Sequence, residues 1–144
     1  MKIIKLVVHH SASSRVKTTK KDIEEWHKKR GFNGIGYHKV IEGSGNVVDG
    51  RSESTQGAHA KGANQGSLGV CVVGNFEKET PTEKQVASLA NVLTKWCQDY
   101  GLDEKKIFGH YNVPNGTTKT ACPGEQLKFK LPTIKLNVQK KLKK

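Results

Sequence analysis

The segment 68–73 (LGVCVV) is a continuous apolar run, and it constrains the fold more than any other feature of the chain. A strand with one face in water alternates apolar and polar residues, whereas a run without alternation indicates a strand covered on both faces. Such a strand needs a packed layer on each side of its sheet. The run therefore predicts an α/β fold with this segment at the centre of the sheet.

Helical patterns occur on both sides of this run. Apolar residues recur at helical spacing from 86 to 100, and Thr80-Pro81-Thr82-Glu83 predicts a capping box with proline at the first helical position. An earlier helix is expected after Thr19, through DIEEWHKKR to the next glycine. A third, basic helix is expected over about 132–144.

Further segments have strand character. Residues 3–9 (IIKLVVH) predict a first strand, and residues 36–42 are followed by a GSGN turn that predicts a hairpin with VVDG. A short strand, KIFGH, is expected to end at His110. With the helices, these strands predict a single α/β domain with a central mixed sheet flanked by helices.

The 144 residues fit one domain spanning 1–144, with a core of about 3–128, and need no disulfides. Three cysteines, an odd number, argue against a disulfide framework. Cys71 and Cys97 lie in apolar patterns and should be buried, whereas Cys122 lies in the polar turn-forming segment TACPG. No apolar run approaches the ~20 residues that span a bilayer. We therefore expect a monomer without a transmembrane segment.

The formal net charge is +12, and the final segment KFKLPTIKLNVQKKLKK holds seven lysines and no acidic residue. This segment fits a solvated helical face. It equally fits a surface for a polyanion such as an anionic lipid, a nucleic acid or the anionic polymers of a bacterial envelope. Few aromatic residues are interleaved with the lysines, which makes nucleic acid the weakest of these partners.

Three residues at distant positions in the sequence are of the types that commonly bind a metal ion together. His9 ends the first predicted strand, His110 ends the last one, and Cys122 lies in the loop that follows. Two imidazoles and a thiolate leave one position of a tetrahedral Zn²⁺ open for water, which is typical of a catalytic zinc. Strand alternation separates His9 from His10, and we expect His9 to face the site. This set predicts zinc-assisted hydrolysis.

Five segments between about residues 5 and 125 carry motifs in a characteristic order: VVHHSAS, EEWHKKRGFNGIGYHKVI, GAHAKGANQGSLGVCVVGNF, GHYNV and TACPG. In these segments the chain resembles the zinc-dependent N-acetylmuramoyl-L-alanine amidases of the type-2 superfamily. That superfamily includes phage endolysins and the animal peptidoglycan recognition proteins. The resemblance implies a substrate groove that runs across a zinc ion on one face of a mixed sheet.

The resemblance also implies roles for individual residues. His9, His110 and Cys122 match the zinc ligands of the family. Tyr37, in the segment GYH, matches its catalytic tyrosine.

Three further positions match less directly. His59 and Asn64 fall in the segment that lines the substrate groove. Thr120 matches a position that is lysine in phage enzymes and threonine in amidase-active recognition proteins. Lys119 is one residue away from that position, and we expect it to face solvent.

The implied substrate is the amide between N-acetylmuramic acid and the first L-alanine of the peptidoglycan stem peptide. Tyr37 and Thr120 are suited to donate hydrogen bonds to the oxyanion of its hydrolysis. We expect a bacteriolytic, endolysin-type enzyme that is made in the cytoplasm without a signal peptide and acts on the cell wall after release. Two alternatives stay open: a non-catalytic peptidoglycan-binding module, and a polymerase-regulating protein that acts through its basic surface.

Overall fold

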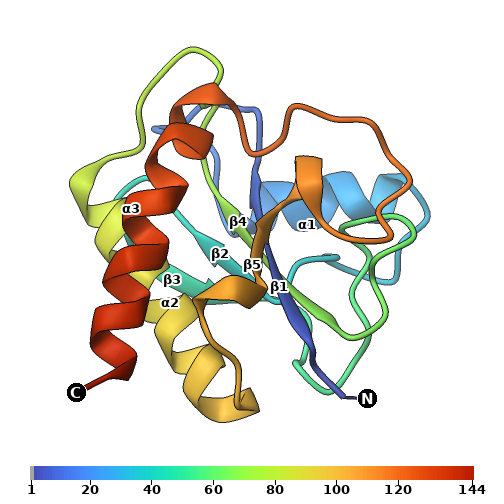
Figure 1. Ribbon diagram of the computed structural model, residues 1–144. Coiled ribbons are helices and arrows are strands. Elements are labelled where there is room, and N and C mark those ends of the chain that lie inside the picture. Colours follow the sequence, from blue (N-terminus) through green and yellow to red (C-terminus); the bar gives the residue numbers. More distant parts are fainter. Residues whose placement is uncertain (1) are drawn as a thin grey trace.

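Strand β4 (Ser67–Val72) lies in the middle of a five-stranded sheet, and every residue in it is buried. The computed structural model describes residues 2–144. The strand order is β3-β2-β4-β1-β5, with the bounds β1 Lys5–His10, β2 Lys39–Ile41, β3 Val47–Asp49 and β5 Ile107–Gly109 (Figure 1). The predicted central position of the apolar run is therefore confirmed.

The sheet is mixed, as expected. β1 pairs with β4 and β5, and β4 pairs with β2, all in parallel, whereas β2 and β3 form the predicted antiparallel hairpin. The carboxyl ends of parallel strands meet at one edge of a sheet. β1 and β5 therefore deliver the residues that follow them to the same edge.

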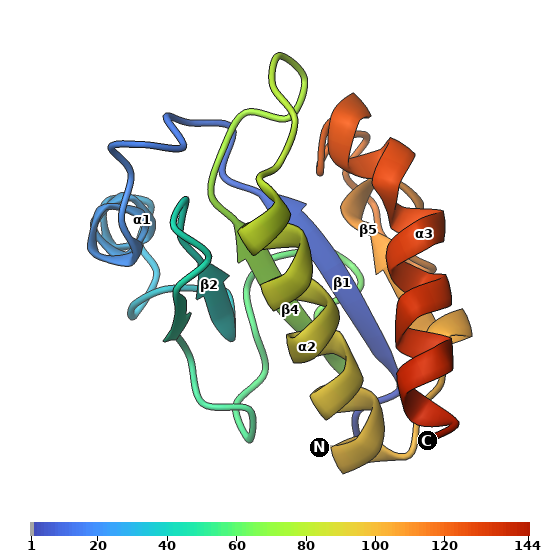
Figure 2. The same cartoon turned by 90° about the vertical axis from the view of Figure 1, so that its left-hand side faces the viewer.

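Two long helices cover one face of the sheet, and a shorter helix covers the other. α2 (Glu83–Tyr100) and α3 (Glu125–Leu142) lie next to each other in front of the sheet in Figure 2. α1 (Lys20–Lys29) lies on the opposite face, where its residue Ile23 belongs to a buried cluster with Cys71.

Alternating side chains of β1 separate these two faces. Val8 belongs to the large core beneath α2 and α3, whereas Val7 packs against a loop on the other face. His10 lies on the helix side, where its Nδ1 accepts the backbone N–H of Phe76 at 3.1 Å. His9 shares a face with Val7, which confirms the predicted separation of the two histidines.

Helix α2 begins two residues later than the sequence pattern predicts. Its N-cap is Thr82, whose hydroxyl accepts the N–H of Gln85, while the Gln85 side chain accepts the N–H of Thr82. Gln85 is fully buried and also donates to the carbonyl oxygen of Val73 at 2.7 Å. This bond to the end of the central strand holds the capping box at Thr82 rather than Thr80. Gly101 ends the helix with a φ of 67°, which glycine favours.

Helix α3 begins at Glu125 rather than near residue 132. Its buried residues recur at helical spacing on the α2 side: Leu127, Leu131, Ile134 and Val138. Pro132 lies inside the helix on its exposed side and costs about 3 kcal/mol or more. Burial of each of the four apolar side chains contributes about 1.5–3 kcal/mol, which outweighs that cost.

The expected surroundings of the cysteines are also confirmed. Cys71 and Cys97 are buried, Cys122 is half-buried, and all three thiols are free. Within residues 2–144, no helix is both long enough and apolar enough to cross a bilayer.

Candidate metal centre and substrate pocket

His9, His110 and Cys122 come together at the carboxyl edge of the parallel strands. His9 is the penultimate residue of β1, His110 opens a short 3-10 turn directly after β5, and Cys122 lies in the loop before α3. One potential ligand atom from each residue lies within 4.8 Å of the other two. The topology accounts for this convergence, since β1 and β5 are parallel neighbours.

The spacing of these atoms fits a zinc ion. His9 Nδ1 and Cys122 Sγ are 3.7 Å apart. Bonds of about 2.3 Å to sulfur and about 2.0–2.1 Å to nitrogen at a tetrahedral angle would separate the two atoms by roughly 3.6 Å. Imidazole and thiolate are donors that zinc prefers, and three protein ligands leave one position for water or substrate. The residues therefore fit the predicted metal.

Hydrogen bonds hold Cys122 in place. Its Sγ accepts the N–H of His10 at 3.3 Å, and its carbonyl oxygen accepts the N–H of Tyr111 at 2.9 Å. Its own N–H donates to Thr120 Oγ1 at 3.1 Å. Burial raises the pKa of the thiol to about 12, although the His10 N–H opposes this shift. A metal ion that binds here must therefore displace a proton from the sulfur.

His9 uses both nitrogens of its buried ring. Nδ1 faces Cys122, and Nε2 lies 2.9 Å from Nδ1 of His59. The other nitrogen of His59, Nε2, lies 3.3 Å from Ser67 Oγ. Burial lowers the pKa of His9 well below 6.5 and that of His59 to about 3, so both imidazoles are neutral at pH 7.

Tyr37 lies beside the three clustered residues. Its ring centroid is 5.0 Å from that of His9, and the ring packs against a buried cluster that includes Cys71. Burial, followed by the sulfurs of Cys71 and Cys122, raises the pKa of the phenol well above 10. Tyr37 is therefore a protonated hydrogen-bond donor at neutral pH.

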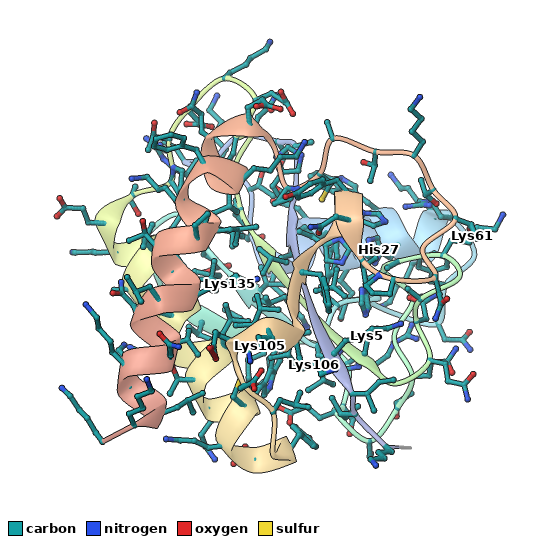
Figure 3. The ribbon with its side chains drawn as sticks, viewed as in Figure 1. Lys5, His27, Lys61, Lys105, Lys106 and Lys135 are labelled. Carbon is teal, nitrogen blue, oxygen red and sulfur yellow. The ribbon has the colours of Figure 1, made fainter. Side chains whose placement is uncertain are left out.

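A pocket of about 500 Å³ opens over this cluster. None of its lining residues is acidic: His9, His27, Arg30, Phe32, Tyr37, Ala58, His59, Ala60, Lys61, Asn64, His110, Thr118 and Cys122. Figure 3 shows His27 and Lys61 on the side of the molecule away from α3. The pocket thus combines a cluster of potential metal ligands with two basic side chains, Arg30 and Lys61.

The predicted groove residues His59 and Asn64 both line this pocket. Asn64 Oδ1 accepts the N–H groups of His59 at 2.9 Å and Ala60 at 2.8 Å, so it shapes the loop that carries His59. These contacts leave the amide nitrogen of Asn64 for a substrate. Substrate binding by the two residues stays a prediction.

Three neighbouring residues in the loop before Cys122 have different surroundings. The Thr120 hydroxyl accepts the N–H of Cys122, whereas Thr118 is the threonine that lines the pocket. Lys119 is exposed, as expected. The role of Thr120 in catalysis stays a prediction.

Sequence reasoning did not identify several pocket residues. Arg30 and Phe32 flank the glycine that ends α1, and the guanidinium of Arg30 lies 5.2 Å from the centre of the Phe32 ring. Lys61 lies two residues after His59 in the same loop. His27 accepts the N–H of Gly36 at 2.8 Å through Nδ1, and its ring forms part of the wall. Proximity in sequence to Tyr37 and His59 was the available signal for these residues.

Basic residues gather at two places on the helical side of the protein. The end of the chain carries the exposed residues Lys140, Lys143 and Lys144, and the helix before them packs against α2. A second group lies where the 3-10 helix η1 (Glu104–Lys106) contacts α3, and Figure 3 shows there Lys105, Lys106 and Lys135. The basic segment therefore forms most of α3, a helix that packs against α2.

Comparison with known proteins supports the resemblance seen in the sequence. Peptidoglycan-recognition protein SD of Drosophila simulans is 40% identical over 100 residues, which are 69% of this chain and 52% of that protein. The endolysin of Escherichia phage T7 is 34% identical over 113 residues, which are 75% of this chain and 71% of the endolysin. The chain thus spans about half the length of the first relative and most of the second.

Solved structures and a family model agree with these relatives. The N-acetylmuramoyl-L-alanine amidase LysC from Clostridium intestinale superposes with a TM-score of 0.84 at 33% identity, over 95% of this chain and 87% of LysC. This similarity confirms the predicted α/β fold. The family model described as N-acetylmuramoyl-L-alanine amidase matches residues 1–125. The chain therefore belongs to the N-acetylmuramoyl-L-alanine amidase family.

Proposed function

We propose that the protein is a zinc-dependent enzyme that hydrolyses the amide between N-acetylmuramic acid and L-alanine in peptidoglycan. The convergence of His9, His110 and Cys122 beneath a pocket carries this proposal, because two imidazoles and a thiolate suit a catalytic zinc. Family membership supports the choice of bond. The endolysin relatives support action on the cell wall after release.

The residues of the chain have separate tasks in this reaction. His9, His110 and Cys122 hold the metal. When bound, zinc supplies the Lewis acidity that polarises a carbonyl and makes water nucleophilic near neutral pH. The Tyr37 phenol, protonated and next to His9, donates a hydrogen bond to the oxyanion that develops on the substrate. The Thr120 hydroxyl is a second donor, because its oxygen accepts from Cys122 and its hydrogen stays free.

The charge of the pocket suits a stem peptide with free carboxylates. Arg30 and Lys61 line it and no lining residue is acidic, so an anionic ligand meets two cations without an opposing charge. The planar guanidinium of Arg30 can bind a carboxylate through two parallel hydrogen bonds. His59 and Asn64 line the same pocket and complete the proposed binding surface.

The basic end of α3 is a proposed contact for anionic polymers of the cell envelope. Lys140, Lys143 and Lys144 are exposed, and attraction between exposed charges falls as salt increases. Replacement of these three residues by glutamine should weaken binding to purified sacculi at low salt more than at high salt. Lys119→Gln, at an exposed lysine outside the helix, is the control. If the variant binds sacculi as tightly as wild type does at both salt concentrations, the lysines contribute to solubility alone.

A matched pair of cysteine variants tests the catalytic proposal. Cys122→Ala should lose both bound zinc and hydrolysis, whereas Cys97→Ala, in the core on the helix side, should keep both. Mass spectrometry of sacculus digests identifies the bond that is cut, and elemental analysis measures zinc. A chelator should abolish activity, and added zinc should restore it.

Two outcomes would contradict this proposal. Undiminished zinc in Cys122→Ala would remove the cysteine from the ligand set. Zinc-loaded wild type that binds sacculi and releases no peptide would instead favour the binding role, which the resemblance to a recognition protein keeps as the second candidate.

A further inference from the structure

The ring of His59 occupies a place that the sheet keeps open for it. A Cβ atom added at Gly69, in the middle of β4, would lie 2.6 Å from the ring, so glycine is required there for the ring to pack against the strand. His59 is 9% exposed, and both of its ring nitrogens already have partners inside the protein. His59 therefore has a function in the interior besides any contact with substrate.

Ser67 determines the direction of the hydrogen bonds around His59. It is fully buried, and its one hydroxyl hydrogen has the carbonyl oxygen of Ala63 as its nearest acceptor, at 2.7 Å. The second neighbouring acceptor, the carbonyl of Asn64 at 3.1 Å, also requires the serine to donate. The Ser67 oxygen must then accept from His59, so the Nε2 of His59 carries a hydrogen.

The tautomer of His59 in turn determines that of His9. A neutral imidazole has a single N–H, so a His59 protonated at Nε2 presents a lone pair at Nδ1. This lone pair faces His9 Nε2 at 2.9 Å, which must therefore carry a hydrogen. The Nδ1 of His9 is left bare, and it faces Cys122 Sγ at 3.7 Å.

We propose that Ser67 and His59 are positioning residues that fix the tautomer and orientation of His9, so that its bare Nδ1 is ready for zinc before the metal arrives. The consequence for zinc rests on the proposed function, whereas the tautomer is a property of the metal-free protein. Hydrogen-bond partners of metal-binding histidines typically contribute about 10–100-fold to metal affinity.

NMR tests the tautomers without any metal. Long-range 1H–15N correlation spectra of the metal-free full chain should record both His9 and His59 as the Nε2–H form. Ser67→Ala removes the acceptor for His59 and should convert both histidines to mixtures of tautomers. Ser88→Ala removes a hydroxyl of α2 that donates to the Gly45 carbonyl in the turn between β2 and β3, and it should leave both histidines unchanged. A wild-type His9 in the Nδ1–H form would overturn the proposal.

A competition titration with a chromophoric chelator tests the expected effect on zinc affinity, with zinc itself as the probe. His59→Leu removes the acceptor for His9 and should weaken zinc binding about 10–100-fold. His59→Asn keeps an oxygen acceptor near the position of Nδ1, so its zinc affinity should fall less than that of His59→Leu. Ser88→Ala is the control and should bind zinc as wild type does.

The outcomes separate this proposal from the proposed function. Equal zinc affinity of wild type and His59→Leu would overturn the positioning role while the enzyme keeps its metal. A wild type that binds no zinc would contradict the proposed function instead, and the NMR spectra would then decide the tautomer. If His59→Leu does not fold, His59→Asn and Ser67→Ala are used for both the NMR spectra and the zinc titration.

Discussion

The hydroxyl oxygen of Thr120 accepts the N–H of Cys122 at 3.1 Å, which ties a proposed oxyanion donor to the backbone of a proposed metal ligand. A hydroxyl that accepts one hydrogen bond keeps its own hydrogen for another. Thr118, two residues earlier, lines the pocket from the same loop. The two threonines therefore form a matched pair for mutagenesis.

Thr120→Val should lower turnover, because it removes the proposed donor and the acceptor for Cys122 together. One oxyanion donor typically contributes about 10²–10³ in rate, and the lost backbone contact should lower the unfolding free energy by about 0.5–1.5 kcal/mol. Thr118→Val, with the same change of shape, should keep turnover within a few-fold of wild type. Steady-state kinetics on muropeptides compares them. A larger loss of turnover in Thr118→Val than in Thr120→Val would indicate that Thr118, not Thr120, is the donor.

Tyr37→Phe should lower kcat by about 10²–10³ while zinc content stays at the wild-type level. The phenol lies next to His9 but outside the proposed ligand set, so its removal should affect the oxyanion and leave the metal in place. Tyr111→Phe is the control, since Tyr111 is half-exposed and packs under Lys128. Full activity in Tyr37→Phe would exclude the tyrosine from catalysis.

Arg30→Gln and Lys61→Gln should each raise KM for anionic muropeptides by about tenfold, which corresponds to 1.4 kcal/mol of lost binding. The two substitutions should raise KM much less for an analogue with amidated carboxyl groups. Arg15→Gln breaks a salt bridge with Glu79 outside the pocket and should leave KM unchanged. Equal KM changes for the charged and amidated substrates would show that the cations do not recognise carboxylates.

The metal-free protein should lose stability as the pH falls below about 6.5. Burial lowers the pKa of His27 and His38 below their usual 6.5, and Arg30 and Arg51 lower that of His27 further. The unfolded chain therefore binds protons near pH 6 that the folded chain does not, so the unfolding free energy rises with pH in that range. The slope is at most about 1.4 kcal/mol per pH unit for each histidine.

Urea unfolding in the presence of a chelator, at pH values between 5 and 8, measures this slope. His27→Gln should reduce this slope, because the residue at position 27 then no longer takes up a proton on unfolding. A stability that does not change with pH over this range would contradict the lowered pKa of the buried histidines.

Much of the fold follows from local patterns in the sequence. The unbroken apolar run of β4 requires cover on both faces, and that alone predicts the central strand and the layers around it. Alternation along β1 separates His9 from His10, because a strand has only two faces. The convergence of His9 with His110 depends on β1 and β5 being parallel neighbours that end at one edge, and this pairing is established only in the folded chain.

The remaining features depend on contacts between distant segments. The start of α2 depends on Gln85, whose bond to the Val73 carbonyl no local capping rule contains. The contacts of His59 depend on Gly69 and Ser67, which a loop and a strand bring together only in the folded chain. A helix-stop signal at Gly31 predicts where α1 ends, but it gives no information on the direction of the Arg30 side chain.

The two sides of the sheet hold different kinds of interior. Most of the buried leucine and isoleucine side chains lie beneath α2 and α3, whereas the pocket residues lie on the other side of β1. Engineering for heat resistance can therefore concentrate on the helical side, where cavity filling and helix redesign would leave the reaction chemistry undisturbed.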